Sequence, residues 1–176
     1  MVFITGATLA LFTGDVNDGT IGINAVSGNV DIDIVDTTPV ERPPSLVGQV
    51  LHFYTTKESD EDLLFEPGAT YYTEGFRIKN YGNIPVNFIL YVSEDERIED
   101  DFYDAFEVWI TQNPEKGMRY AEELREYEGR LEPGAISDVY YLVVKMKEDA
   151  GNKFQGRPFE GFGVTVCAVQ GNVNID

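Results

Sequence analysis

The sequence predicts a mainly β protein, an antiparallel β-sandwich of jelly-roll type with two short helical insertions. Three observations support this fold class. Aromatic residues make up 12% of the chain, with ten Tyr and eleven Phe against one Trp, and such residues favour half-buried strands. Val30 to Val35 alternates apolar and acidic side chains, as a strand with one buried face does. Turn signals recur at intervals of about 8 to 12 residues, which is typical of sandwiches.

The expected elements follow from these alternations and from turn residues. About eight to ten short strands are expected, and their principal ranges are 20–23, 30–35, 47–54, 70–79, 84–92, 107–111, 139–146 and 163–170. The Asn80-Tyr81-Gly82-Asn83 turn predicts a hairpin into the strand that begins near Pro85. Helices are expected over 93–106, which begins with a Ser-x-x-Glu cap, and over 118–129, which ends at a glycine.

One short sequence motif, which contains Pro-Gly, occurs twice. Phe65-Glu66-Pro67-Gly68-Ala69 precedes the strand 70–79, and Leu131-Glu132-Pro133-Gly134-Ala135 precedes the strand 139–146. Proline fixes φ and glycine permits positive φ, so each Pro-Gly pair predicts a tight turn before a long strand. The spacing indicates related edges of two facing sheets, because a solenoid would need more copies.

Length and charge restrict the class of protein. The 176 residues fit one domain with one core, so residues 15–176 are expected to form the sandwich and residues 1–14 a separate N-terminal strand or export-signal tail. The net charge of −18 repels nucleic acid and anionic membrane surfaces. The sequence contains no run of 18 or more apolar residues, so no membrane span is expected.

The N-terminal segment is apolar from Val2 to Phe12, and the first basic residue is Arg42. It is similar to the core of a signal peptide but lacks the basic flank. As a strand it would place two sets of side chains on opposite faces: Val2, Ile4, Thr8, Ala10 and Phe12 on one, and Phe3, Ala7, Leu9 and Leu11 on the other.

Few residues favour catalysis or metal binding. His52 is the single histidine, so a zinc motif is absent, and its apolar surroundings favour a structural role over catalysis. Asp15 to Gly19 is read as a turn, since it lacks the ligand spacing of a calcium loop. No cofactor is expected, although the acidic runs leave open weak binding of divalent cations such as calcium. Cys167 is expected to be a buried small hydrophobe, with a reactive thiol as the alternative.

Several motifs, in order along the chain, resemble the TasA/camelysin family of biofilm matrix fibre proteins, to which archaeal bundling pili are related. Gly6 to Thr13 resembles the family's export-signal cleavage region, and Ser27 to Ile32 is similar to the beginning of one of its strands. Further resemblances lie at 67–82, 101–108, 151–156 and 168–170. Phe154 stands where the family often has Tyr.

The resemblance implies a secreted, extracellular structural protein of jelly-roll fold that is not an enzyme. It implies a homopolymer, built by donor-strand insertion of each N-terminal segment into the next subunit, with other matrix components as further partners. The donor residues would be Val2, Phe3, Ile4, Ala7, Leu9, Leu11 and Phe12. Alternatives are a monomeric cell-surface adhesion or carbohydrate-binding sandwich and, with a single histidine against it, a camelysin-like secreted metalloprotease.

Overall fold

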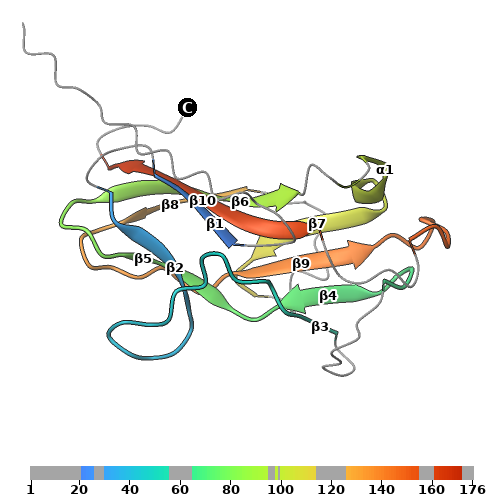
Figure 1. Ribbon diagram of the computed structural model, residues 1–176, viewed down its shortest axis with the longest axis horizontal. Coiled ribbons are helices and arrows are strands. Elements are labelled where there is room, and N and C mark those ends of the chain that lie inside the picture. Colours follow the sequence, from blue (N-terminus) through green and yellow to red (C-terminus); the bar gives the residue numbers. More distant parts are fainter. Residues whose placement is uncertain are drawn as a thin grey trace, which may run out of the picture.

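The fold is a mainly β arrangement of two layers, seen in a computed structural model that describes residues 21–25, 30–55, 65–94, 98, 100–113, 126–154 and 161–171 (Figure 1). The first layer has the strand order β1-β10-β6-β8. Its strands are β1 (Ile21–Ala25), β10 (Phe162–Gln170), β6 (Val86–Glu94) and β8 (Glu126–Leu131). β10 and β6 form its centre, paired antiparallel from Phe162↔Glu94 to Gln170↔Val86.

The second layer contains two hydrogen-bonded sets of strands that share one long ribbon. One set has the order β3-β4-β9-β7 and the other is the pair β2-β5. The bounds are β2 (Ile32–Asp36), β3 (Phe53–Thr55), β4 (Thr70–Thr73), β5 (Phe76–Asn80), β7 (Phe106–Thr111) and β9 (Tyr141–Met146). The bridges Phe76↔Tyr140 and Lys79↔Ile136 continue the β4–β9 ladder along β5, so residues 70–80 and 136–146 run side by side across the layer.

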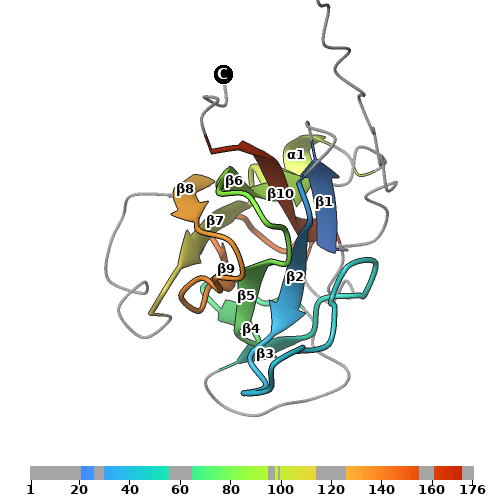
Figure 2. The same ribbon diagram turned by 90° about the vertical axis from the view of Figure 1, so that its left-hand side faces the viewer.

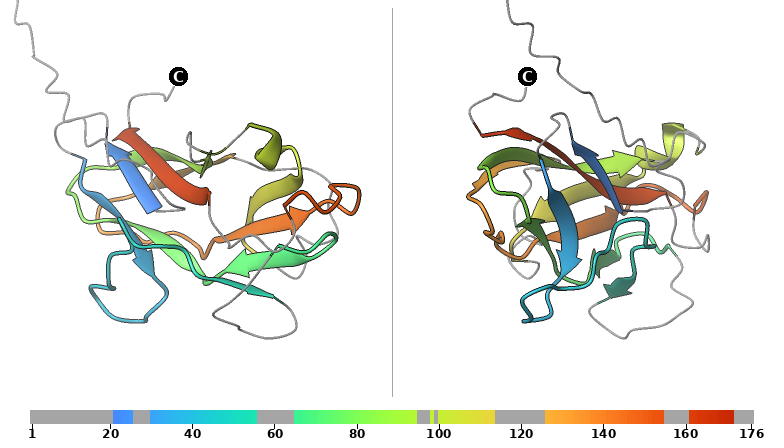
Figure 3. Two further views of the ribbon diagram at one scale, coloured as in Figure 1. Left: turned by 45° about the vertical axis from the view of Figure 1, so that its right-hand side comes forward. Right: turned by 60° about the vertical axis from the view of Figure 1, so that its left-hand side comes forward.

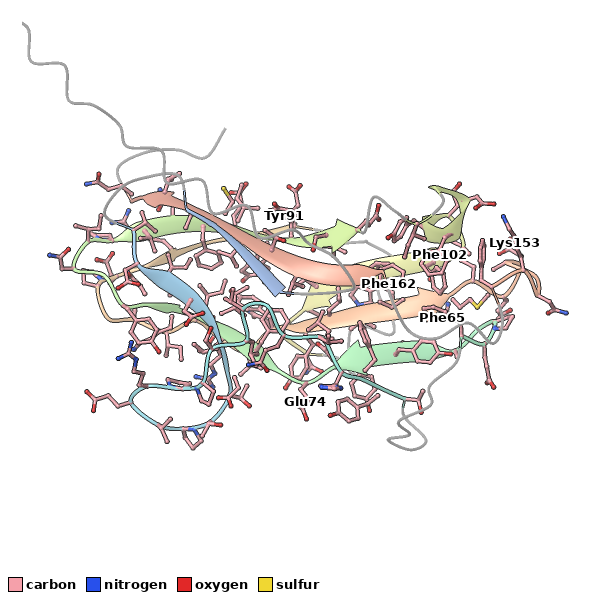
Figure 4. The ribbon with its side chains drawn as sticks, in the orientation of Figure 1. Phe65, Glu74, Tyr91, Phe102, Lys153 and Phe162 are labelled. Carbon is pink, nitrogen blue, oxygen red and sulfur yellow. The ribbon has the colours of Figure 1, made fainter. Side chains whose placement is uncertain are left out.

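The core lies between the two layers. Strand alternation supplies it: Val164, Val166 and Ala168 of β10 are fully buried and point inward. At one end, Phe65, Phe102 and Phe162 pack with ring centroids 5.6 to 6.4 Å apart. Figure 4 shows these three rings gathered between the layers near α1 (Asp100–Tyr103).

Both Pro-Gly turns have the predicted geometry. Gly68 and Gly134 have φ of 78° and 73°, and the turns close through Ala69 N–H to Glu66 O and Ala135 N–H to Glu132 O, each over 3.0 Å. The prediction that they mark edges of two facing sheets is wrong. The strands that follow them pair with each other in the second layer, so each turn lies beside the far end of the other strand.

The predicted hairpin after Asn80 is also wrong. β5 lies in the second layer and β6 in the first, so the turn at Asn80 to Asn83 carries the chain from one layer to the other. Asn80 is fully buried, and its Nδ2 donates to the carbonyl oxygens of Ile84 and Leu131 over 2.8 and 3.3 Å. The sequence predicts a turn at this position, and a turn is present, but turn residues do not specify which sheet the next strand joins. β6 does begin directly after Pro85, as expected.

The two helical insertions are not present as predicted. In the range 93–106, Ser93 and Glu94 end β6, a single helical turn occupies α1, and Phe106 begins β7. The range 118–129 ends in β8, which starts at Glu126, and its earlier residues lie outside the described part. In β8, Tyr127 and Gly129 face inward and alternate with exposed Glu126 and Glu128. A burial period of two residues is typical of a strand and not of the predicted helix.

The remaining strand predictions are confirmed with shifted ends. β2, β7, β9 and β10 lie within or beside their predicted ranges. The strand expected over 47–54 is shorter in the structure, where it is β3. The residues just before the predicted range form hydrogen bonds with the edge of β2: Asp36 N–H donates to Pro44 O, and Leu46 N–H donates to Ile34 O. The strand over 70–79 is divided at Glu74 and Gly75 into β4 and β5.

Candidate functional site

The predicted N-terminal strand lies outside the described residues, as do Val2, Phe3, Ile4, Ala7, Leu9, Leu11 and Phe12. The turn expected from Asp15 to Gly19 lies outside them too. The described chain begins with β1 at the edge of the first layer, where it lies alongside β10 in both views of Figure 3. The first described element along the chain is therefore an edge strand of the first layer.

The pairing of β1 with β10 is parallel, whereas every other strand pair in the described part is antiparallel. Its register runs from Ile21↔Val164 to Ala25↔Ala168. β1 thus covers five of the nine residues of β10. Parallel pairs are slightly less stable per residue than antiparallel ones, so the edge of β10 carries a short partner in its weaker orientation.

The opposite edge of the same layer has a different character. β8 places Glu126, Glu128 and Arg130 on its exposed face. Arg130 pairs with Glu132 over 3.1 Å, and its Nη1 donates to the carbonyl oxygen of Gly171 over 2.7 Å. Charged side chains along an edge strand discourage pairing with another chain. Figure 2 shows β8 and β1 at opposite sides of the layer.

Inside β8, Gly129 lies directly under the ring of Phe88, its partner across the ladder. A Cβ at Gly129 would lie 2.4 Å from Cζ of Phe88. The glycine is therefore required for the ring to reach the core. Sequence reasoning treated Gly129 as the end of a helix, and the apolar alternation of Tyr127, Gly129 and Leu131 was the signal that could have shown the strand.

Cys167 is half-buried on the outer side of β10, opposite Ile89, so the prediction of a buried residue is only partly correct. The neighbouring Val166 and Ala168 point into the core instead. Burial raises the pKa of the Cys167 thiol, and the protonated thiol is a poor nucleophile.

The residues considered for chemistry do not form a site in the described part of the chain. His52 is exposed, just before β3. No group of three His, Cys, Asp or Glu side chains placed to hold a metal occurs among the described residues. Burial raises the pKa of Asp33 in β2, while the Ser45 hydroxyl donates to its carboxylate over 2.8 Å. Asp33 is thus positioned by the loop that covers the edge of β2.

Comparison of the chain with protein-family models, with curated proteins and with solved structures gives no match. Within the described ranges, no helix is long and apolar enough to cross a membrane. The function is therefore argued from the residues and geometry above.

Proposed function

We propose that this protein is a structural subunit of an extracellular filament, a biofilm matrix fibre or a pilus, related in kind to the TasA/camelysin proteins that its motifs resemble. Subunits would join head to tail, each inserting its N-terminal segment as a donor strand into the sandwich of the next. The sandwich would be a jelly roll, and secretion would place it at the cell surface or in the matrix, where other matrix components are further partners.

The observation that carries the proposal is a run of uncharged residues that precedes, along the sequence, an edge strand of the first layer. Residues 2–12 contain no charged side chain, and the first described strand after them, β1, lies at the edge of its sheet. Pairing of such an apolar strand with a sheet edge of a neighbouring copy would add a strand to that sheet.

Burial of the apolar segment would offset much of the cost of association. Burying five or six large side chains of the segment at roughly 1.5 to 3 kcal/mol each provides on the order of 10 kcal/mol, before ladder hydrogen bonds are counted. Association costs about 4 to 15 kcal/mol, so ladder bonds and contacts between subunits decide the balance. Head-to-tail insertion that does not close into a ring produces a filament.

The acceptor in this proposal is the edge of β10 that β1 occupies, so the donor strand would displace β1. Its inward side chains Val164, Val166 and Ala168 are already buried against the core, and its present partner β1 is short and parallel. A donor strand entering beside β10 in antiparallel orientation would form the more stable ladder. The charged edge at β8 offers no comparable advantage.

Electron microscopy of the purified full chain tests the proposal. The chain should form filaments, and the double variant Ile4→Asp/Leu9→Asp should remain dispersed with an unchanged far-UV circular dichroism spectrum. The matched control is Val40→Asp/Val50→Asp, which adds the same charge at side chains that are 53% and 58% exposed in a loop and should still polymerise. Filaments of the first variant equal to those of the control would contradict donor-strand insertion.

A further inference from the structure

Three tyrosine side chains share the outer face of the second layer. Tyr54 of β3 lies directly opposite Tyr72 of β4, and Tyr72 lies opposite Val143 of β9. Tyr141 is two residues along β9 and therefore faces the same way. The neighbouring Tyr71 points into the core, so the alternation leaves these three rings outside. Each of the three is half-buried and keeps part of its surface exposed.

Hydrogen-bonding groups surround these rings. The Tyr54 hydroxyl donates to Oε1 of Glu74 over 2.7 Å, and the Tyr72 hydroxyl donates to the carbonyl oxygen of Thr55 over 3.4 Å. Figure 4 shows Glu74 on the lower side of the molecule, away from the space between the layers. The face thus combines aromatic rings with a carboxylate that is held in place and can accept further hydrogen bonds.

The row across the strands ends at Trp109 of β7, the register partner of Val143. Trp109 is only 8% exposed, and its indole N–H has no hydrogen-bond acceptor among the residues that the structure describes. A buried indole N–H usually finds a partner. Because this N–H is itself buried, the surface that a ligand could contact on this face consists of the three tyrosine rings.

We propose that this tyrosine face, defined by Tyr54, Tyr72 and Tyr141, binds a neutral polysaccharide chain. Sugar rings present C–H faces and hydroxyl edges, and aromatic side chains with polar tips offer the complementary apolar face and hydrogen bonds. Adjacent strands lie about 4.8 Å apart, so rings on β3, β4 and β9 form an extended platform suited to a linear polymer.

Charge and composition select the class of polymer. The net charge of −18 repels anionic polysaccharides. The centre of a protein interface is depleted of charged residues, whereas this face holds the carboxylate of Glu74 against the Tyr54 hydroxyl. A neutral glycan is therefore the occupant that the face favours over an acidic glycan or a protein.

Affinity electrophoresis of the full chain tests the inference, in native gels that contain hydroxyethylcellulose, galactomannan or dextran as neutral probes and alginate as an anionic probe. At least one neutral polymer should retard the wild-type chain, and alginate should not. Each of Tyr54→Ala, Tyr72→Ala and Tyr141→Ala should lower the association constant roughly two- to tenfold. Tyr91→Ala, on the outer face of the first layer, is the matched control and should bind as the wild type does.

Absence of retardation in all three neutral polymers would overturn the inference. So would equal retardation in alginate, or unchanged binding by all three tyrosine variants. Circular dichroism checks that each variant is folded. Tyr54→Ala alters only the three-residue edge strand β3, so its loss of binding remains decisive even if the substitutions at β4 or β9 disturb the sheet. None of these outcomes depends on filament formation.

Discussion

The side-chain amide of Asn80 donates a hydrogen bond to the carbonyl oxygen of Leu131 over 3.3 Å, across 51 positions of sequence. The same nitrogen donates to Glu132 O and Ile84 O over 3.2 and 2.8 Å, and Oδ1 accepts from Gly82 N–H over 2.9 Å. Residues 80–86 and 131–136 are the two passages between the layers that meet here. One buried amide therefore holds together both crossings at this end of the sandwich.

Asn80→Ala should lower the free energy of unfolding by about 1 to 3 kcal/mol, because it removes the hydrogen bonds that a fully buried amide donates to Ile84 O and Leu131 O. Asn80→Asp should be at least as damaging, since a carboxylate would face those carbonyl oxygens. Urea unfolding followed by circular dichroism measures the change. Asn83→Ala is the control, because Asn83 is exposed in the same turn, and its midpoint should remain close to that of the wild type. A small effect at Asn80 would show that the crossings are held by other contacts.

Gly129→Ala should destabilise the protein by roughly 1 to 3 kcal/mol, because its Cβ would lie 2.4 Å from Cζ of Phe88. Phe88→Leu creates space at the same place and should lose stability for a different reason, the reduced burial. The double variant should therefore be more stable than the sum of the two single effects implies. Thermal unfolding of all four chains gives the coupling energy. Simple additivity would contradict the close contact between Phe88 and Gly129.

Stability should fall at alkaline pH because of buried tyrosines. Burial is the largest cause of the raised pKa of Tyr140, whose ring lies 4.9 Å from that of Tyr127, and burial also raises the pKa of Tyr71. The unfolded chain, whose tyrosines ionise near pH 10, then loses these protons before the folded chain does. The stabilisation is complete below about pH 10 and is lost as the pH rises above it.

Tyr140→Phe removes one of these ionisable groups. The free energy of unfolding of this variant should decline less steeply above about pH 10 than that of the wild type. Urea titrations between about pH 8 and pH 11 measure the two slopes. Parallel curves would mean that Tyr140 does not hold its proton more tightly in the folded chain.

Filament assembly should accelerate with salt. Subunits that each carry a charge of −18 repel one another beyond the Debye length, which is about 30 Å at ~10 mM and about 8 Å at ~150 mM ionic strength. Light scattering after transfer from low to moderate NaCl should show shorter lag times. CaCl₂ at matched ionic strength should act like NaCl if screening alone operates, and a large excess effect of calcium would instead indicate specific divalent binding. Salt-independent rates would contradict the electrostatic argument.

The sequence predicted the fold class because apolar alternation and turn residues act locally. β2, β10 and the two Pro-Gly turns follow directly from such signals. It did not predict which strands become neighbours: the pairing of residues 70–80 with 136–146, and the layer change at Asn80, depend on the whole core. The sequence predicts a helix that ends within β8, because the charged Glu and Arg side chains of its outward face hide the alternation of a strand.

The candidate interface could be predicted only in part. The apolar character of residues 2–12 is evident from the sequence, whereas the parallel pairing of β1 with β10 is a long-range property with no local signature. The tyrosine face was not predicted either. Tyr54, Tyr72 and Tyr141 are 18 and 69 positions apart in sequence (72 − 54 and 141 − 72), and only the strand register brings them to one surface.

Binding of the N-terminal segment in trans tests the central claim most directly. A fluorescent peptide of residues 2–12 is titrated with a chain from which the same residues have been removed, and its anisotropy is recorded against a scrambled peptide of equal composition. Donor-strand insertion predicts saturable binding of the native peptide with one site per chain, and little binding of the scrambled one. Equal binding of both peptides, or none of the native peptide by a folded truncated chain, would contradict the account.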